Sequence, residues 1–229
     1  MAEGGEVLGF LNERDRQTLS EMFRDLKFPV HLVLFYDPDQ EWSVHTQGIL
    51  NEVVSLMPDL LHLEAYDFYK NRLLAALYGV ERVPTFLLRD KNEDDTGIRI
   101  LGMPSGYEFA VLIEDILEVS TGKSRLSEKT INYVRNLEHD VLLRVFVTPT
   151  WPHCPRAVRL VHQIALANPA RIRGESVESG AFAEMAEAEA VYAVPKTIVT
   201  IQDIGRKQTF EGALSEDHLV RQLKALLEF

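Results

Sequence analysis

The chain has one cysteine in 229 residues, Cys154, in the segment Trp151-Pro152-His153-Cys154-Pro155. A thiolate can attack a disulfide, and both a helix N-terminus and a neighbouring histidine lower the pKa of a thiol. His153 precedes the cysteine, and Pro155 suits the first turn of a helix, where its missing N–H has no partner to lose. We therefore expect a helix to begin at Pro155 and take Cys154 as the candidate nucleophile.

Two parts of the chain repeat at a constant distance. The strand-like run Val30–Phe35 recurs as Val141–Phe146, and Val83-Pro84 recurs as Val194-Pro195. Both pairs are 111 residues apart (146 − 35 and 195 − 84). Each half then closes with a strand, a glycine and an amphipathic helix. Two equal offsets and a shared ending indicate an internal duplication.

Within each half, strand-like and helix-like periods alternate. Leading helices should begin at Asn12-Glu13 and Ser127-Glu128, because a capping residue followed by an acid favours a helix N-terminus. A further helix is expected over 182–192. The order α-βαβαββα in both halves predicts an α/β fold in which each half is a mixed four-stranded sheet flanked by helices.

The polar, glycine-containing segment 120–125 is the expected linker between the halves. It divides the chain into domains 1–122 and 123–229, each close to the usual size of a small domain.

The net charge of −11 and the pI near 5.1 argue against nucleic acid or an anionic membrane as the main partner. Residues 1–6 show no secretory signal, and the apolar runs are shorter than the ~20 residues of a spanning helix. With a single cysteine, which fits a reducing compartment, these features predict a cytoplasmic protein. The seven histidines show no metal-ligand spacing and no glycine-rich phosphate loop is present, so we expect no metal and no cofactor.

Several segments together resemble the protein disulfide oxidoreductases of thermophilic archaea and bacteria, glutaredoxin-like proteins made of two thioredoxin folds. The sharpest are 101–109, 145–150, 155–160, 193–196 and 210–212. The resemblance runs over nearly the whole chain and implies two tandem thioredoxin-like folds. In that family Thr-Pro-Thr is followed by Cys-Pro-Tyr-Cys-Pro, whereas here Trp151 occupies the attacking position and Cys154 the resolving one.

The first half should carry another Cys-x-x-Cys, and the resemblance places Glu41-Trp42-Ser43-Val44 there, within one residue of alignment. Three of the family's four working cysteines are therefore absent. Dithiol exchange needs a second thiol to resolve the mixed disulfide. Any remaining chemistry would be monothiol, and an outside thiol such as glutathione would have to release Cys154.

In the second half, each residue at the position of the family's Cys-x-x-Cys has two interpretations. Cys154 is either a monothiol nucleophile or redox sensor, or a half-buried remnant, since the resolving sulfur of this fold is the less exposed one. Trp151 either anchors a peptide or covers the vacated site. His153 either tunes the thiol or is an ordinary exposed loop histidine.

The resemblance also implies cis peptide bonds before Pro84 and Pro195, facing the two active-site loops. In this fold the residue before the proline, here Val83 or Val194, offers backbone groups to an extended peptide. The expected substrate-binding residues are Trp151, Pro152, His153, Val194 and Pro195.

Two functions follow from these observations. The first is a divergent protein disulfide oxidoreductase with monothiol chemistry at Cys154. The alternative is a redox-inactive thioredoxin-fold module that binds a peptide or protein. The sequence leaves open whether the chain is an enzyme and what its oligomeric state is.

Overall fold

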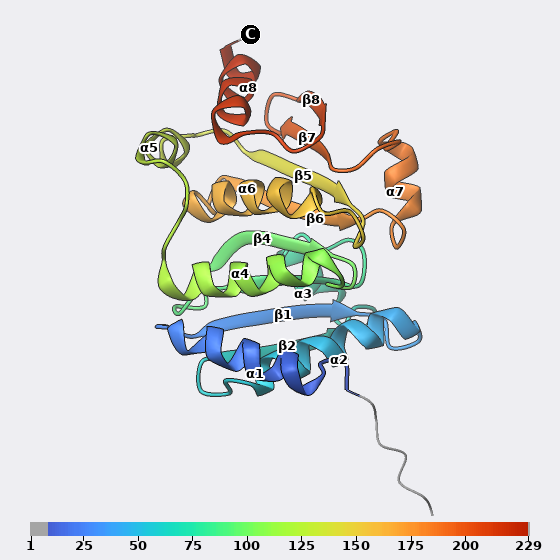
Figure 1. The fold of residues 1–229 in the computed structure, drawn as a ribbon. Helices are drawn as coiled ribbons and strands as arrows, with labels where there is room; N and C mark the ends of the chain where they lie inside the picture. Colours follow the sequence, from blue (N-terminus) through green and yellow to red (C-terminus); the bar gives the residue numbers. More distant parts are fainter. Residues whose placement is uncertain (1–8, 229) are drawn as a thin grey trace, which may run out of the picture.

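The computed structural model describes residues 9–228, in which the order α-βαβαββα occurs twice, as predicted (Figure 1). The first half contains α1 (Glu13–Met22), the 3-10 turn η1 (Phe23–Asp25), β1 (Val30–Tyr36), α2 (Glu41–Ser55), β2 (Leu61–Asp67), α3 (Arg72–Leu77), β3 (Thr85–Arg89), β4 (Asp95–Leu101) and α4 (Tyr107–Thr121). The second contains α5 (Glu128–Arg135), β5 (Val141–Val147), α6 (Cys154–Ala167), β6 (Ile172–Glu178), α7 (Ala183–Ala188), β7 (Lys196–Ile201), β8 (Arg206–Glu211) and α8 (Glu216–Glu228).

All eight strands belong to one mixed sheet, in the order β2-β1-β3-β4-β6-β5-β7-β8. Both halves use the same pairing, parallel for β1 with β2 and for β5 with β6, and antiparallel for the rest. The halves join where β4 and β6 pair in parallel, with Ile98 opposite Gly174. The mixed α/β fold is thus confirmed, while the boundary between 1–122 and 123–229 stays a prediction.

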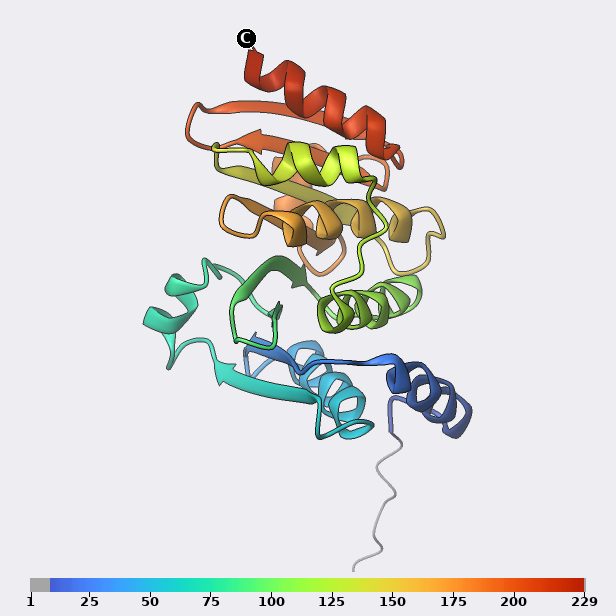
Figure 2. The same cartoon turned by 90° about the vertical axis from the view of Figure 1, so that its left-hand side faces the viewer.

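Helices cover both faces of this sheet. Figures 1 and 2 show α4 and α6 side by side on one face and α3 on the opposite face. Gly174 in β6 lies against α6, because a Cβ there would come 2.7 Å from the carbonyl oxygen of Val161. The neighbouring β6 residues therefore point to the face that carries α3.

The predicted helix starts are confirmed in both leading helices. The side chain of Asn12 accepts a hydrogen bond from the Asp15 N–H, and that of Ser127 accepts one from the Thr130 N–H. Helix α6 begins at Cys154, one residue earlier than expected, and α7 is shorter than the predicted 182–192.

The predicted linker over 120–125 is wrong at its start, because α4 continues to Thr121 and Gly122 ends it in the left-handed region. Ser120 is buried, and its hydroxyl accepts hydrogen bonds from the N–H groups of Lys27 and Phe28. Its short polar side chain is thus part of the first half's core.

Among residues 9–228, no helix combines the length and hydropathy that crossing a bilayer requires. The interpretation of residues 1–6 as lacking a secretory signal falls on the first eight residues, which lie outside the described part of the chain.

Candidate functional site

Cys154 is the first residue of α6 and follows the loop 148–153 at the end of β5. The loop turns tightly, because the N–H of Trp151 donates to the Thr148 carbonyl and the N–H of Cys154 donates to the Trp151 carbonyl. Gly106, at φ +56°, lies so close to this loop that a Cβ there would come 2.3 Å from the Pro149 carbonyl oxygen. The loop is therefore held against the start of α4, in the other half.

The sulfur of Cys154 is enclosed in the core of the second half. Its side chain is 0% exposed and belongs to one apolar cluster with Val147, Val158 and, from α4, Val111. Burial raises the pKa of the Cys154 thiol to about 11, and the charge of Glu108 raises it further against a backbone hydrogen bond at Thr148 that lowers it. The position at a helix start does not produce a thiolate here, and the structure agrees with the interpretation of Cys154 as a buried remnant.

The residues before Cys154 lie on the surface. Trp151 is 48% exposed, and Pro152 and His153 are exposed as well. The rings of Trp151 and His153 meet edge to face, with their centroids 5.7 Å apart. An aromatic pair on the surface can contact a partner, whereas the apolar cluster already encloses the sulfur.

Both expected cis peptide bonds are present, Val83-Pro84 and Val194-Pro195. The carbonyl of each proline accepts a hydrogen bond from a glycine after the last strand of its half, Gly102 and Gly212 respectively. Strands β5 and β7 are neighbours, with Phe146 opposite Lys196. The loop after β5 and the Val-Pro pair before β7 therefore lie at the same end of the sheet.

The structure thus brings Trp151, Pro152, His153, Val194 and Pro195 to one region. Val194 is half-buried against the cluster that contains Cys154, and Pro195 is buried. Their roles in binding stay predictions.

The corresponding place in the first half is the start of α2. Trp42 is half-buried, and its ring meets the ring of Phe182 from the second half edge to face, with centroids 5.8 Å apart. Ser43 is buried, and its hydroxyl accepts a hydrogen bond from the Asp37 N–H. A cavity of about 460 Å³ beside them has walls from both halves, among them Trp42, Met103, Pro149 and Ala181.

The sequence did not indicate that Glu108 on α4 would lie near the candidate site. It is only 7% exposed, and burial raises the pKa of its carboxyl to about 8, with Asp115 adding to the effect. Within the described residues its Oε1 atom has no hydrogen-bond partner. A buried carboxyl near a buried thiol opposes the thiolate further.

The contact between α4 and α6 contains further polar groups beside its apolar residues. Asp115 and His162 are fully buried and lie 2.7 Å apart, and Glu118 accepts hydrogen bonds from Arg159 and Gln163. The spacing of Glu108, Asp115 and Glu118 (seven, then three) could have revealed one acidic face on α4, adjoining its apolar stripe.

In the part of the chain that the structure describes, no three His, Cys, Asp or Glu side chains are grouped to hold a metal ion.

No protein-family model matches the chain. A solved domain of the alkylhydroperoxide reductase AhpF from Enterococcus faecalis superposes on 93% of this chain and 100% of its own length, with a TM-score of 0.84 and 27% identity. A protein disulfide oxidoreductase from Aeropyrum pernix covers 93% of this chain and 92% of its own, with a TM-score of 0.83 and 26% identity. The resemblance to the thioredoxin-fold oxidoreductases is confirmed.

Relatives identified by sequence are also redox proteins. The F subunit of alkyl hydroperoxide reductase in Staphylococcus aureus is 25% identical over 207 residues, which are 90% of this chain and 37% of that protein. The chain spans little more than a third of the length of these relatives. With one cysteine, this thioredoxin-fold chain holds no Cys-x-x-Cys pair.

Proposed function

We propose that this chain is a redox-inactive binding module, in which two thioredoxin-like units, 1–122 and 123–229, share one sheet. In this proposal the surface formed by Trp151, Pro152, His153 and Val194, with the buried Pro195 fixing the shape of the backbone beneath it, holds an extended segment of a partner protein. One observation carries it: the only thiol of the chain is 0% exposed, with its pKa raised to about 11.

Thiol–disulfide exchange requires a thiolate that a substrate disulfide can reach. Cys154 offers neither condition, and no second cysteine is present to resolve a mixed disulfide. The monothiol hypothesis would require the start of α6 to open before each reaction, whereas binding at the surface requires no such opening.

The binding surface combines an aromatic anchor with free backbone groups. Tryptophan is among the residue types that contribute most to binding at interfaces, and Trp151 is half-exposed. Within the described residues, neither the N–H nor the C=O of Val194 takes part in a backbone hydrogen bond. An extended peptide can pair with such groups by strand addition.

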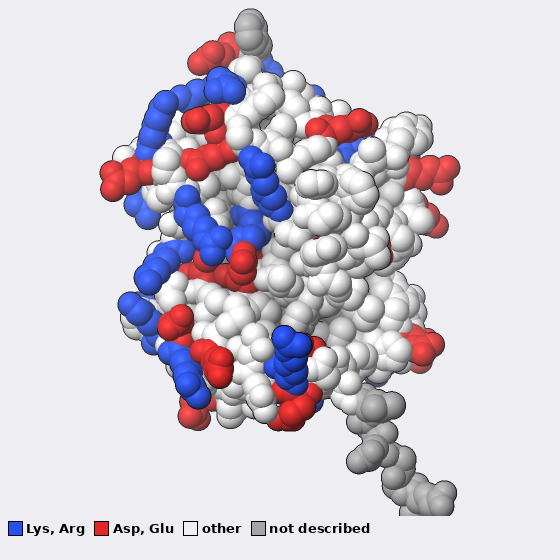
Figure 3. Space-filling model, viewed as in Figure 1, with Lys and Arg blue, Asp and Glu red and all other residues white. Residues whose placement is uncertain are grey.

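The distribution of charge supports the same surface. In Figure 3 most Lys and Arg side chains lie on the left of this face, whereas the area over the ends of β1 and β5 is largely uncharged, with Asp and Glu side chains along its right edge. Since the chain carries a net charge of −11, an uncharged area at the candidate site favours a partner segment with apolar side chains.

A peptide library displayed on phage and selected against the chain tests the proposal. Trp151→Ala should weaken a selected peptide by more than about fivefold, because a contributing interface residue is worth more than ~1 kcal/mol. Tyr69→Ala is the matched control, since Tyr69 is an exposed aromatic beside β2 at the far edge of the sheet and its loss should leave the affinity unchanged.

Equal losses of peptide affinity in Trp151→Ala and Tyr69→Ala would contradict the proposed surface. Incubation of the native chain with oxidised glutathione provides a second arm. A glutathione adduct on Cys154, seen by mass spectrometry without denaturant, would favour the monothiol function instead.

A further inference from the structure

A small cavity of about 140 Å³ lies where β4 meets β6, away from the Trp151 surface. Its walls come from both halves and include Arg82, Arg99, Arg144 and Arg173 against two carboxylates, Glu81 and Glu175. Because Gly174 faces α6, Arg173 and Glu175 point to the opposite face of the sheet. Four guanidinium groups thus gather around one cavity in an otherwise acidic chain.

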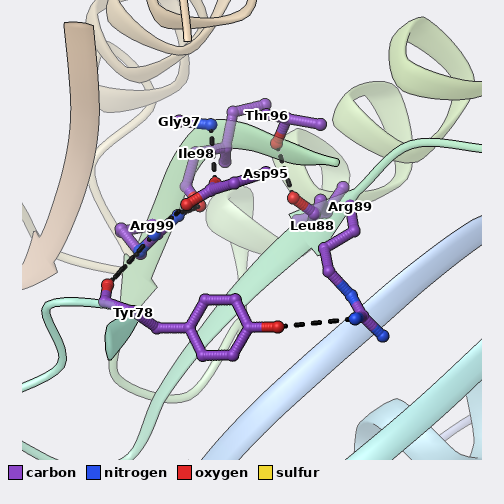
Figure 4. A network of polar contacts seen from close by, with 8 residues as sticks. All are labelled: Tyr78, Leu88, Arg89, Asp95, Thr96, Gly97, Ile98 and Arg99. Atoms are coloured by element: carbon purple, nitrogen blue, oxygen red, sulfur yellow. Dashed lines mark hydrogen bonds and ion pairs between the residues drawn. The ribbon is translucent and has the colours of Figure 1, made fainter. Parts of the chain in front are cut away.

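Two of these arginines are fixed by ion pairs. Arg99 is 2% exposed and donates hydrogen bonds to the Asp95 carboxylate and to the Tyr78 carbonyl (Figure 4). Arg144 donates through Nε to Glu175, with N and O 2.7 Å apart. Arg99, Glu175 and Arg144 are register partners across β4, β6 and β5, so the strands themselves set their positions.

Arg173 is different, because it is half-buried and its guanidinium forms no hydrogen bond and no ion pair with the described residues, 9–228. Gly79, at φ +64°, makes room for it, since a Cβ there would lie 2.5 Å from its Nη1 atom. Burial, together with the charge of Arg99, lowers the pKa of Arg173, while the nearby carboxylates of Glu175, Asp95 and Glu81 act in the opposite direction.

The guanidinium of Arg173 has five N–H donors that no group of the described residues uses, so they are available to a bound acceptor. The guanidinium of Arg82 also donates no hydrogen bond within the described residues, where only the Arg82 carbonyl is bonded, to the Thr85 hydroxyl. Arg144 uses only Nε in its pair with Glu175. Planar guanidinium groups match the oxygens of a tetrahedral anion, to which they can donate two parallel hydrogen bonds. The cavity has space for more than a single water, which needs only about 10–15 Å³.

We propose that this cavity is a binding site for a small oxyanion of the phosphate class, with Arg173 as the main ligand and Arg82 and Arg144 as further donors. The anion would join the two halves, because Arg82 comes from the first half and Arg144 and Arg173 from the second. The site is independent of the function proposed for the Trp151 surface.

Titration with inorganic phosphate, followed by calorimetry at constant ionic strength and with chloride as the reference anion, tests the site. Concentrations up to about 20 mM saturate a site with a dissociation constant near 1 mM. Arg173→Gln should weaken phosphate binding at least about tenfold, because a hydrogen bond to a charged group is worth roughly 1.5–3 kcal/mol. Arg82→Gln should weaken it by a smaller factor.

Arg171→Gln is the matched control. Arg171 lies two residues before Arg173, but it is exposed and pairs with Asp140. Its loss should leave the affinity unchanged. β-Glycerophosphate, a phosphate ester, shows whether the natural ligand is an ester or the free ion. If it binds as tightly as phosphate, the site is supported as a site for a phosphate ester. If only inorganic phosphate binds, the site is supported as a site for the free ion.

The proposal is wrong if the wild-type chain shows no saturable phosphate binding beyond that of chloride. It is equally wrong if Arg173→Gln binds like the wild type, or if Arg171→Gln loses as much affinity as Arg173→Gln. Circular dichroism checks the fold of each variant. Should Arg173→Gln fail to fold, the exposed Arg82→Gln decides, and unchanged binding in that variant would overturn the site.

Discussion

Alkylation of Cys154 in the native protein should be slower than that of an exposed thiol by at least two orders of magnitude. Burial raises the pKa of this thiol from 9.0 to about 11. A pKa higher by about two lowers the thiolate population about 100-fold at any pH below about 8, and only the thiolate reacts. The sulfur is also 0% exposed, so restricted access slows the reaction further.

The assay is the rate of iodoacetamide labelling, followed by intact mass at about pH 7.5. The matched control is the double variant Trp151→Cys with Cys154→Ala, which moves the single thiol three residues to a position that is 48% exposed. That variant should label at close to the rate of a free thiol, and the wild type should reach the same rate only in denaturant. Native labelling of Cys154 within about tenfold of the control rate would refute the reasoning.

Three further predictions concern the same region. Trp151→Cys alone recreates Cys-Pro-His-Cys and should confer insulin reduction that the wild type lacks; an inactive but folded variant would show that more than the attacking thiol has been lost. Asp115→Ala should lower the free energy of unfolding in urea by about 1–3 kcal/mol, because it leaves a ring nitrogen of the buried His162 without its hydrogen-bond partner; a loss below about 0.5 kcal/mol would contradict a contribution of this pair to stability. Folding raises the pKa of Glu108 from 4.5 to about 8. The contribution of Glu108 to the free energy of unfolding is therefore full below about pH 4.5 and is lost as the pH rises through 8. Glu108→Gln should flatten the fall in the free energy of unfolding between these two pH values.

The sequence predicts the local structure of this chain well. The 111-residue offset identifies the repeated order of elements, and capping residues such as Asn12 and Ser127 identify helix starts. These features depend on near neighbours in the chain. The positions of the cis prolines follow from the family resemblance.

Contacts between the halves could not be predicted in the same way. The sequence does not show that β4 pairs with β6, since every strand edge offers the same backbone N–H and C=O groups. The environment of Cys154 depends on Val111 and Glu108, which α4 contributes from the other half. The pairing of β4 with β6 also creates the arginine cavity, because it brings together Arg99 and Arg173, which are far apart in the sequence.

The affinity of a selected peptide for Cys154→Ala, compared with Trp151→Ala, tests the central claim most directly. If the cysteine is structural and the surface binds, Cys154→Ala should keep the wild-type dissociation constant within about twofold, while Trp151→Ala raises it more than about fivefold. A peptide that depends on Cys154 as strongly as on Trp151 would contradict the account.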